Sequence, residues 1–279
     1  MMVINSNRAA DRAALARNTA DSRQRAAAER LSTGRRINSA ADDAAGLAIS
    51  KSLVSRIWGM QQNLRNVADG ISMAQTAQGA LAQMTGNLQR IRELAVQASN
   101  GTYTHDDRLM LQAEAGELRE QFMHSLLGTR FNGKALFREM TGQEKPLQGN
   151  SWGSTVFSIQ AGPDADSVIE GEFALPFAPT FDLTLPESLA ETLGTLDAAL
   201  DGLGETAARY GAFERGLQSS LSLLKTNLIN LSASRPGIGD ADYASEAVAL
   251  AKARIMSEAS SAMLTQANIS HKAVLTLLR

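Results

Sequence analysis

The sequence predicts a mainly α fold, a long helical coiled-coil bundle formed by the N- and C-terminal segments, with a small β-rich excursion in the middle. Three observations indicate this class. From Ile57 the apolar residues recur in steps of three and four, the spacing of a coiled-coil face. Gly, Pro and Asn turn signals interrupt the stretch from Phe131 to about Phe181. Both ends of the chain are rich in Ala.

Residues 45–137 are predicted to form the N-terminal part of the helical core. Four glycines weaken its first helix, so we expect packing against partners to hold that helix together. A break at Ser99-Asn100-Gly101 ends it, and Asp106 with Asp107 is predicted to cap a second helix that returns as an antiparallel hairpin. The apolar face of the first helix gives the first part of a predicted assembly stripe: Ile57, Leu64, Ile71, Leu81 and Leu88.

Residues 138–187 are predicted to be a small β-rich surface segment. Short runs such as STVFSIQA and VIEGEFAL have strand character and are separated by turn signals. The aromatic side chains Trp152, Phe157, Phe173 and Phe177 could be stacking platforms for a glycan, but aromatic residues in so small a unit more often form its core.

Residues 188–235 are predicted to form the C-terminal helix of the core, running to about Ser232. The sequence Arg235-Pro236-Gly237-Ile238-Gly239 is expected to stop it, because Pro and Gly oppose a continuous helix. Pro236, Gly237 and Gly239 are therefore a predicted hinge, with a plain loop as the alternative. Asp240 or Asp242 can cap a final helix.

The terminal segments, residues 1–44 and 236–279, are predicted to pair with each other as inner-core helices. Each offers Ala where a core would want Leu, so neither buries enough apolar area to offset its ordering entropy alone. We expect them to fold on assembly with a partner. The second part of the predicted assembly stripe lies here: Val248, Ile255, Leu275 and Leu278.

Composition argues against several kinds of chemistry. The balance of 27 Lys+Arg against 29 Asp+Glu disfavours nucleic acid as a partner. With no Cys and three scattered His in 279 residues, we expect no metal, no cofactor and no enzyme activity. No stretch is apolar for long enough to insert into a membrane. The basic N-terminal segment lacks the apolar run of a classical signal peptide, and its composition disfavours a transit peptide.

The adjacent acids Asp42 and Asp43 form a candidate carboxylate pair. Neighbouring residues on a helix point in different directions, and no third ligand lies near in sequence. We therefore expect capping or an ion pair with Arg35 or Arg36 rather than metal binding.

Six separated motifs resemble the matching segments of bacterial flagellins, in the same order. They are LSTGRRINSAADDAAGLAIS, NVADGISMAQTAQGAL, NLQRIRELAVQASN, RFNGKALF, DADYASEAVALAKARI and LTQANISHKAVLTLLR. Six motifs in order are much more specific than one short pattern. The resemblance implies a short flagellin with a minimal central domain, a structural subunit that polymerises into the flagellar filament for motility.

The same resemblance implies location and partners. Flagellins are secreted through the flagellar type III export apparatus to the extracellular flagellum. An export chaperone holds the C-terminal helix beforehand. The subunit then polymerises with itself as a helical homopolymer and meets hook-junction and cap proteins. All of these are expectations for this chain.

Flagellins also carry a surface that the vertebrate innate immune flagellin receptor reads. Gln89, Arg90, Leu94 and Glu114 match its pattern, which implies recognition of this chain by that receptor. The alternative is an ordinary solvated face, since Leu88 and Ile91 point inward on that helix. Two other functions stay open: a hook–filament junction protein, and a flagellin-like cell-surface glycan-binding protein.

Overall fold

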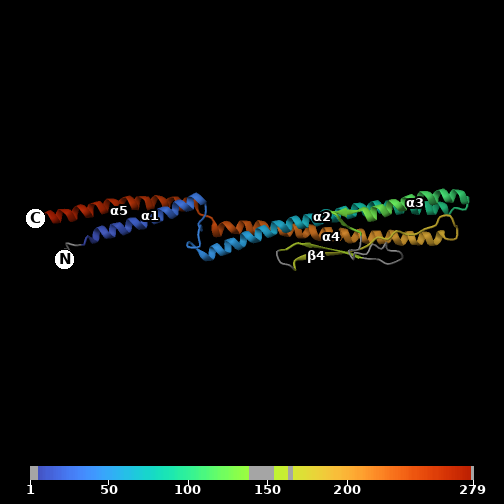
Figure 1. Cartoon of the computed structure of the whole chain (residues 1–279), viewed down its shortest axis with the longest axis horizontal. Coiled ribbons are helices and arrows are strands. Elements are labelled where there is room, and N and C mark those ends of the chain that lie inside the picture. Colours follow the sequence, from blue (N-terminus) through green and yellow to red (C-terminus); the bar gives the residue numbers. More distant parts are fainter. Residues whose placement is uncertain (1–5, 138–153, 163–165, 278–279) are drawn as a thin grey trace. The chain divides into compact units, whose positions relative to one another are not determined.

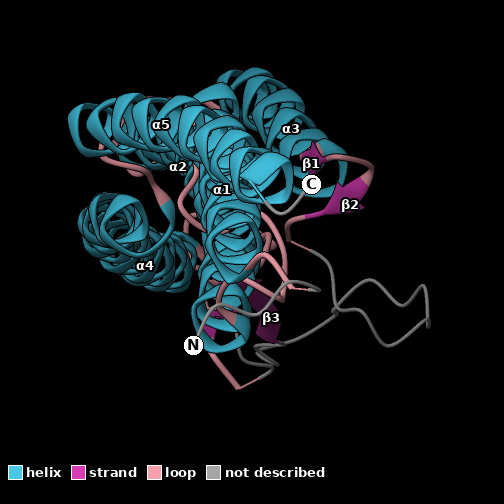
Figure 2. Cartoon of the chain, turned by 90° about the vertical axis from the view of Figure 1, so that its left-hand side faces the viewer, coloured by secondary structure: helices cyan, strands magenta, loops and turns pink. Residues whose placement is uncertain are grey.

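The computed structural model describes residues 6–137, 154–162 and 166–277, with side chains described as far as Ala273. The chain forms two compact units, and each unit combines early and late parts of the sequence. Unit 1 contains Met1–Ile57 and Ile229–Arg279, and unit 2 contains Trp58–Leu228. Helices form most of the described chain and strands only short hairpins (Figures 1 and 2), which confirms the predicted fold class.

The elements follow one another as the sequence predicts, with their bounds set by local signals. The helices are α1 (Arg8–Thr33), α2 (Ala44–Ala98), α3 (His105–Gly128), α4 (Leu189–Gly239) and α5 (Tyr243–Leu277). The strands are β1 (Arg130–Phe131), β2 (Lys134–Ala135), β3 (Ser154–Gln160) and β4 (Val168–Ala174).

The first helix ends earlier than its composition suggests. Gly34 adopts a left-handed conformation (φ 67°) directly after α1, and this is the usual way in which glycine terminates a helix. Residues 35–43 are a connector, so Asp42 and Asp43 do not lie on a helix as predicted. At the other end Asn7 caps α1 by accepting a hydrogen bond from the Ala10 amide at 3.0 Å.

The predicted stop at residues 235–239 is wrong. Helix α4 includes Pro236 and continues to Gly239. The Pro236 carbonyl accepts a hydrogen bond from the Asp240 amide at 3.0 Å, so the last turn closes after the proline. The helix continues past Pro236 to Gly239, although a proline inside a helix removes one N–H donor and its ring crowds the carbonyl of the residue four positions earlier. Asp242 caps α5 by accepting from the Ala244 amide, as predicted.

In unit 2, α2 and α3 form the predicted antiparallel hairpin, but the cap of α3 differs from the prediction. Thr104 is the N-cap, and Asp107 completes a capping box by accepting from the Thr104 amide at 2.9 Å. These hydrogen bonds lower the pKa of Asp107. Asp106 makes no part of the box.

Two β-hairpins follow α3. Asn132 and Gly133 both have positive φ, as a type I′ turn between β1 and β2 requires. In the second hairpin β3 pairs antiparallel with β4, from Ser154 opposite Ala174 to Gln160 opposite Val168. Alternate residues of both strands are buried, so one face of the hairpin packs inward.

An aromatic cluster attaches this hairpin to α4. Phe173 stacks on Tyr210 with ring centroids 3.7 Å apart and meets Phe213 edge-on at 5.4 Å. Phe157 lies beside Phe173 at 6.1 Å. Tyr210 is fully buried, and burial raises its pKa. The core interpretation of Phe157 and Phe173 is therefore correct, and neither ring is open to a glycan; Trp152 lies outside the described residues.

Glycines on α2 play two different roles, which stability measurements can separate. A Cβ atom at Gly70 would lie 3.1 Å from side-chain atoms of both Ile159 and Leu217, whereas one at Gly79 would meet nothing within 4 Å. We expect Gly70→Val to reduce the free energy of unfolding by about 1–3 kcal/mol through overpacking. Gly79→Ala should raise it by about 0.5–1 kcal/mol through helix propensity. Urea unfolding of the soluble chain measures both, and equal effects would contradict the assignment.

Candidate assembly surface

Helices α1 and α5 of unit 1 lie side by side and run antiparallel (Figure 1). Three side-chain contacts show the direction. Arg30 forms an ion pair with Glu246 at 3.1 Å, the Ser257 hydroxyl donates to Asp21 at 2.6 Å, and the Asn7 amide donates to the Ala267 carbonyl at 3.1 Å. Positions along α1 rise as positions along α5 fall.

The seam between the two helices is made of small side chains. Ala20 and Ala27 on α1, and Ala253 and Ser260 on α5, are its buried residues. Within each helix the two are seven positions apart, which is one coiled-coil heptad. Small residues let the backbones approach closely but bury little apolar area per residue.

The opposite face of α5 is apolar and uncovered. Val248 is 68% exposed and Ile255 is 65% exposed, and Ile269 is also exposed. With Ala262 these residues follow a second heptad spacing, and we call them the open stripe. Isolated apolar residues on a surface are ordinary, but a continuous stripe along a helix is typical of an interaction face.

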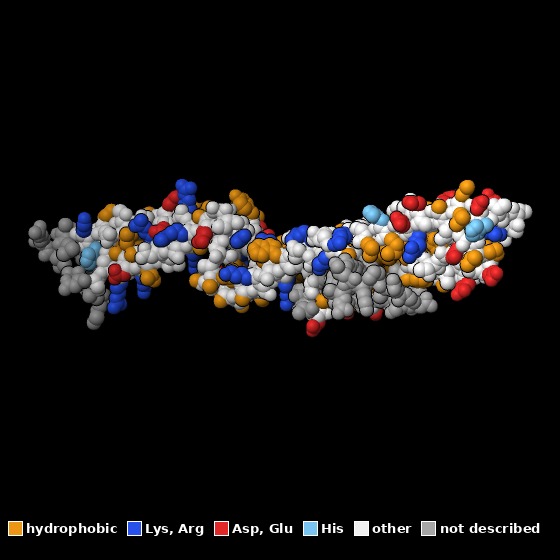
Figure 3. Space-filling view, turned by 45° about the vertical axis from the view of Figure 1, so that its right-hand side comes forward, with side chains coloured by type: hydrophobic (Ala, Val, Ile, Leu, Met, Phe, Trp, Pro, Cys, Tyr) orange, Lys and Arg blue, Asp and Glu red, His pale blue; other side chains and the backbone are white. Residues whose placement is uncertain are grey.

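Two depressions lie beside the open stripe on unit 1. A groove of about 650 Å³ runs between α1 and α5, with Leu15 and Met256 among its lining residues. Arg12, Arg23 and Lys252 also line it, and none of these three forms an ion pair with another described residue. A shallower depression of about 340 Å³ is lined by Val248, Ala251, Lys252, Ile255 and Met256. Figure 3 shows apolar side chains among cationic ones at the surface.

The predicted assembly stripe divides into two kinds of residue. Ile57, Leu81 and Leu88 are buried, and Leu64 and Ile71 are half-buried against the core of unit 2. These side chains stabilise the chain itself. Val248 and Ile255 belong to the open stripe. Leu275 lies on α5, in the part whose side chains are not described, and Leu278 lies outside the described residues.

The predicted hinge residues lie in the last turn of α4, next to a pair of connectors. One connector, residues 35–43, follows Gly34, and the other, residues 240–242, joins α4 to α5. They are joined by backbone hydrogen bonds: Arg36 donates to the Gly239 carbonyl at 2.8 Å, and Ala241 donates to the Gly34 carbonyl at 3.0 Å. Arg35 and Asp240 form a β-bridge between them. The segment that follows α1 and the segment that joins α4 to α5 therefore lie side by side and are hydrogen-bonded to each other.

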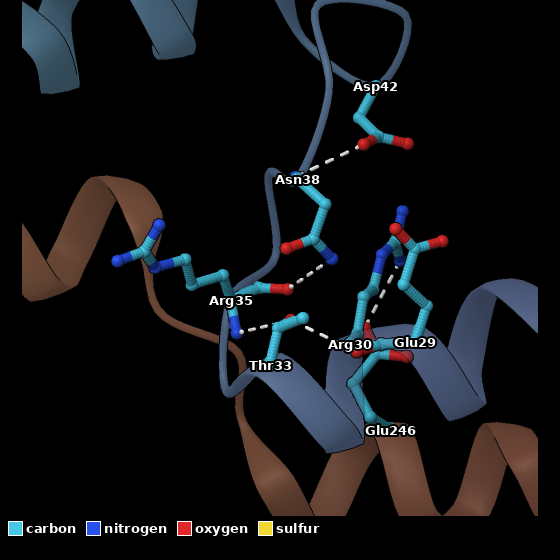
Figure 4. Close-up of polar contacts among 7 residues, drawn as sticks. All are labelled: Glu29, Arg30, Thr33, Arg35, Asn38, Asp42 and Glu246. Atoms are coloured by element: carbon cyan, nitrogen blue, oxygen red, sulfur yellow. Dashed lines mark hydrogen bonds and ion pairs between the residues drawn. The ribbon is translucent and has the colours of Figure 1, made fainter.

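Asp42 and Asp43 have separate structural roles, in line with the expected capping and ion pairing; Figure 4 shows Asp42 beside Asn38. Asp42 accepts from the backbone and hydroxyl of Ser39 and from the Asn38 amide, and these hydrogen bonds lower its pKa. Asp43 caps α2 by accepting from the Gly46 amide at 2.8 Å, and it lies 3.7 Å from the Arg36 guanidinium.

The four residues matched to the receptor pattern do not form one exposed surface. Gln89, Arg90 and Glu114 are exposed, whereas Leu94 is 1% exposed. Arg90 bridges α2 and α3 by pairing with Glu114 at 2.9 Å, and it also pairs with Glu93 at 3.0 Å. These bonds raise the pKa of Arg90.

No group of three or more His, Asp or Glu that could hold a metal ion occurs in the part of the chain that the structure describes. Among those residues, no helix is both long and apolar enough to cross a membrane.

The α1-facing side of α5 was missed by sequence reasoning, although a signal for it exists. Its covered or half-covered positions follow steps of three and four: Leu250, Ala253, Ser257, Ser260, Leu264 and Ala267. Only two of these are large apolar residues. A search for helical periodicity that counted Ala and Ser as core residues would have identified this face as well as the more hydrophobic open stripe.

Known proteins match the chain over most of its length. A family model described as the bacterial flagellin N-terminal helical region matches residues 4–141, and one described as the C-terminal helical region matches residues 193–278. The Treponema maltophilum flagellar filament 31.3 kDa core protein is 33% identical over 266 residues, covering 90% of this chain and 91% of that protein.

Two further relatives are flagellins of other bacteria. The flagellin of Halalkalibacterium halodurans is 36% identical over 253 residues, covering 91% of each chain. The flagellin of Bacillus subtilis is 36% identical over 279 residues, covering 90% of this chain and 91% of that protein. The two family models and these relatives show that the chain belongs to the bacterial flagellin family.

Proposed function

We propose that this chain is the structural subunit of a flagellar filament, and that the open stripe of α5 is buried between copies. The observation that carries the proposal is the stripe itself, which leaves Val248, Ile255 and Ile269 in solvent on the face opposite α1. Burying one such side chain contributes about 1.5–3 kcal/mol. The role is structural rather than enzymatic.

The surfaces of unit 1 favour an open polymer over a closed dimer. The groove between α1 and α5 is lined by residues other than those of the open stripe, so the two are different patches of the unit. Contacts between two different patches are heterologous, and they generate helical filaments when the rotation does not close. A filament grown in this way adds each copy to a free surface at its end.

Folding coupled to assembly follows from the weak seam. An Ala-lined pair buries too little area to offset the ordering of two helices that together contain 61 residues, 26 in α1 and 35 in α5. Contacts with neighbouring copies supply the remainder. The chain would then leave the cell unfolded through type III export, with a chaperone on its C-terminal helix, and reach the extracellular flagellum.

Other partners are proposed from family membership alone. Hook-junction and cap proteins would meet the same helices at the filament ends. Recognition by the vertebrate innate receptor would use Gln89, Arg90 and Glu114, and the burial of Leu94 gives that residue a supporting role beneath the surface.

The proposal predicts that one carboxylate on the open stripe strongly weakens assembly. Ile255→Asp would place an unpaired charge in a buried interface, at a cost of about 3 kcal/mol or more for each copy. The critical concentration for seeded polymerisation should rise on the order of 100-fold. Sedimentation and electron microscopy measure it.

Thr265→Asp is the matched control, because Thr265 is exposed on α5 and lines neither depression. It should leave the critical concentration within about threefold of the original value. Normal filaments from Ile255→Asp would remove the open stripe from the interface.

The filament role is preferred to the two alternatives. A hook–filament junction protein shares the terminal helices, and purified chain that capped filaments without extending them would favour it. A glycan-binding protein would need exposed aromatic platforms, and Phe157 and Phe173 are buried.

A further inference from the structure

The seam between α1 and α5 carries little information about register. Ala20 and Ala27 are identical residues one heptad apart, and Ala253 and Ser260 are nearly so. A slip of seven residues, about 10 Å along the helix, would place Ala27 where Ala20 was. Coiled coils fix their register with large or polar side chains at seam positions, and the fully buried residues of this seam are all small, with Leu250 and Leu264 half-buried beside them.

The polar contacts along the pair are weak determinants of register. The ion pair between Arg30 and Glu246 is partly exposed. Asp21 accepts one part-buried hydrogen bond from Ser257, and the Asn7 amide donates to the Ala267 carbonyl and the Asn268 side chain. Partly exposed contacts of this kind, few in number along two long helices, contribute modestly to stability. Another feature must therefore select one register among several similar ones.

The connectors lie at the end of the seam where α1 ends and α5 begins. Arg36 makes three contacts there: its backbone donates to the Gly239 carbonyl at 2.8 Å, its guanidinium donates to the Ile238 carbonyl at 2.8 Å, and it lies 3.7 Å from Asp43. Ala241 adds a fourth bond, to Gly34. A seven-residue slip of α1 against α5 would pull Gly34 away from Ala241 and break all the bonds between the connectors.

We propose that the paired connectors, with Arg36 as the positioning residue, select the register of α1 against α5. The inference rests on the proposed assembly function and deepens it, since a slipped pair would present the open stripe of α5 at the wrong height relative to α1. We call the contacts of Arg36 and Ala241 with residues 34 and 238–239 the clamp. It consists of two backbone hydrogen bonds and one bond from the Arg36 guanidinium, and it lies outside the seam.

Disulfide trapping tests the register directly, because the chain has no Cys of its own. Asp21→Cys with Ser257→Cys reports the observed register, since those two side chains touch. Asp21→Cys with Leu250→Cys, or with Leu264→Cys, reports a slip of one heptad in either direction. Disulfides require Cα atoms within about 7 Å. Positions 250, 257 and 264 follow one another at about 10 Å along the helix, so each cysteine pair can cross-link in only one register.

With the clamp intact, only the first pair should cross-link efficiently. Arg36→Ala should raise the yield of the slipped products about tenfold, since bonds that involve a charged group are among the stronger ones. Arg36→Lys should restore the observed register in part by supplying a donor to the Ile238 carbonyl. Ala241→Pro is a second clamp variant, because it removes the N–H that bonds to Gly34.

Arg35→Ala is the matched control. It removes the same charge one residue earlier, and the Arg35 side chain makes no hydrogen bond or ion pair with the described residues; in Figure 4 it points away from the Arg30 and Glu246 pair. This variant should cross-link as the original chain does. Slipped products from Arg35→Ala at the level of Arg36→Ala would overturn the proposal.

The trapping is done on seeded polymer and on soluble full-length chain in an osmolyte that favours buried states. Failure to polymerise would count against the proposed function, while the soluble chain would still report the register. If both clamp variants cross-linked exclusively through the pair at positions 21 and 257, the register proposal would be overturned, whether or not filaments form.

Discussion

A chain cut to residues 58–228 is expected to stay folded and to form no filament at any concentration at which the full chain assembles. The buried core cluster extends from Val67 to Leu224 and lies wholly within that range. The cut removes α1, α5 and the open stripe. Cooperative urea unfolding measured beside seeded sedimentation would show both results.

The longer fragment of residues 45–235 tests the same idea with the boundaries that the sequence suggests. It should also unfold cooperatively and fail to polymerise. Full-length chain from the same preparation, seeded in parallel, controls for seed quality. Filaments from either fragment would move the assembly contacts into unit 2 and contradict the role of α5.

Phe173→Ala is expected to reduce the free energy of unfolding of unit 2 by about 3–5 kcal/mol, the usual cost of deleting a buried aromatic ring. Phe173 is buried between Tyr210, Phe213 and Phe157. Its loss leaves a cavity and removes the stacked contact with Tyr210, so the β3–β4 hairpin should separate from α4 first. Urea unfolding followed by near-ultraviolet circular dichroism measures the change.

Val156→Ala is the companion variant for that measurement. Val156 lies on β3 beside Phe157 but points outward and is exposed. Its truncation should change the free energy of unfolding by about 0.5 kcal/mol or less. Equal losses from the two variants would mean that the hairpin is held by its strand pairing and not by the aromatic cluster.

Periodicity predicted the parts of this fold in which large apolar residues mark the buried face. The stripe through Leu81 and Leu88 is buried as its spacing requires. Prediction was poorest where the helical pattern and a single Gly or Pro point to different outcomes. Gly34 ended a helix that composition alone would continue, and α4 continued through Pro236 because its remaining hydrogen bonds could close the last turn.

The candidate site was predicted in part, for a physical reason. Val248 and Ile255 were found because they are large and regularly spaced, but the sequence alone does not say whether such a stripe meets another part of the same chain or another molecule. The side of α5 that meets α1 consists largely of Ala and Ser, which carry little hydrophobic signal. The sequence pattern therefore identified the more hydrophobic stripe of α5, which is the face that α1 does not cover.

The small seam between α1 and α5 has a consequence for how the sequence can vary. A change at Ala20, Ala27 or Ala253 to anything larger adds atoms between two closely packed backbones. The one smaller residue, Gly, weakens the helix by about 1 kcal/mol. These positions are constrained from both directions, so mutational scanning should find them nearly invariant although each buries very little surface.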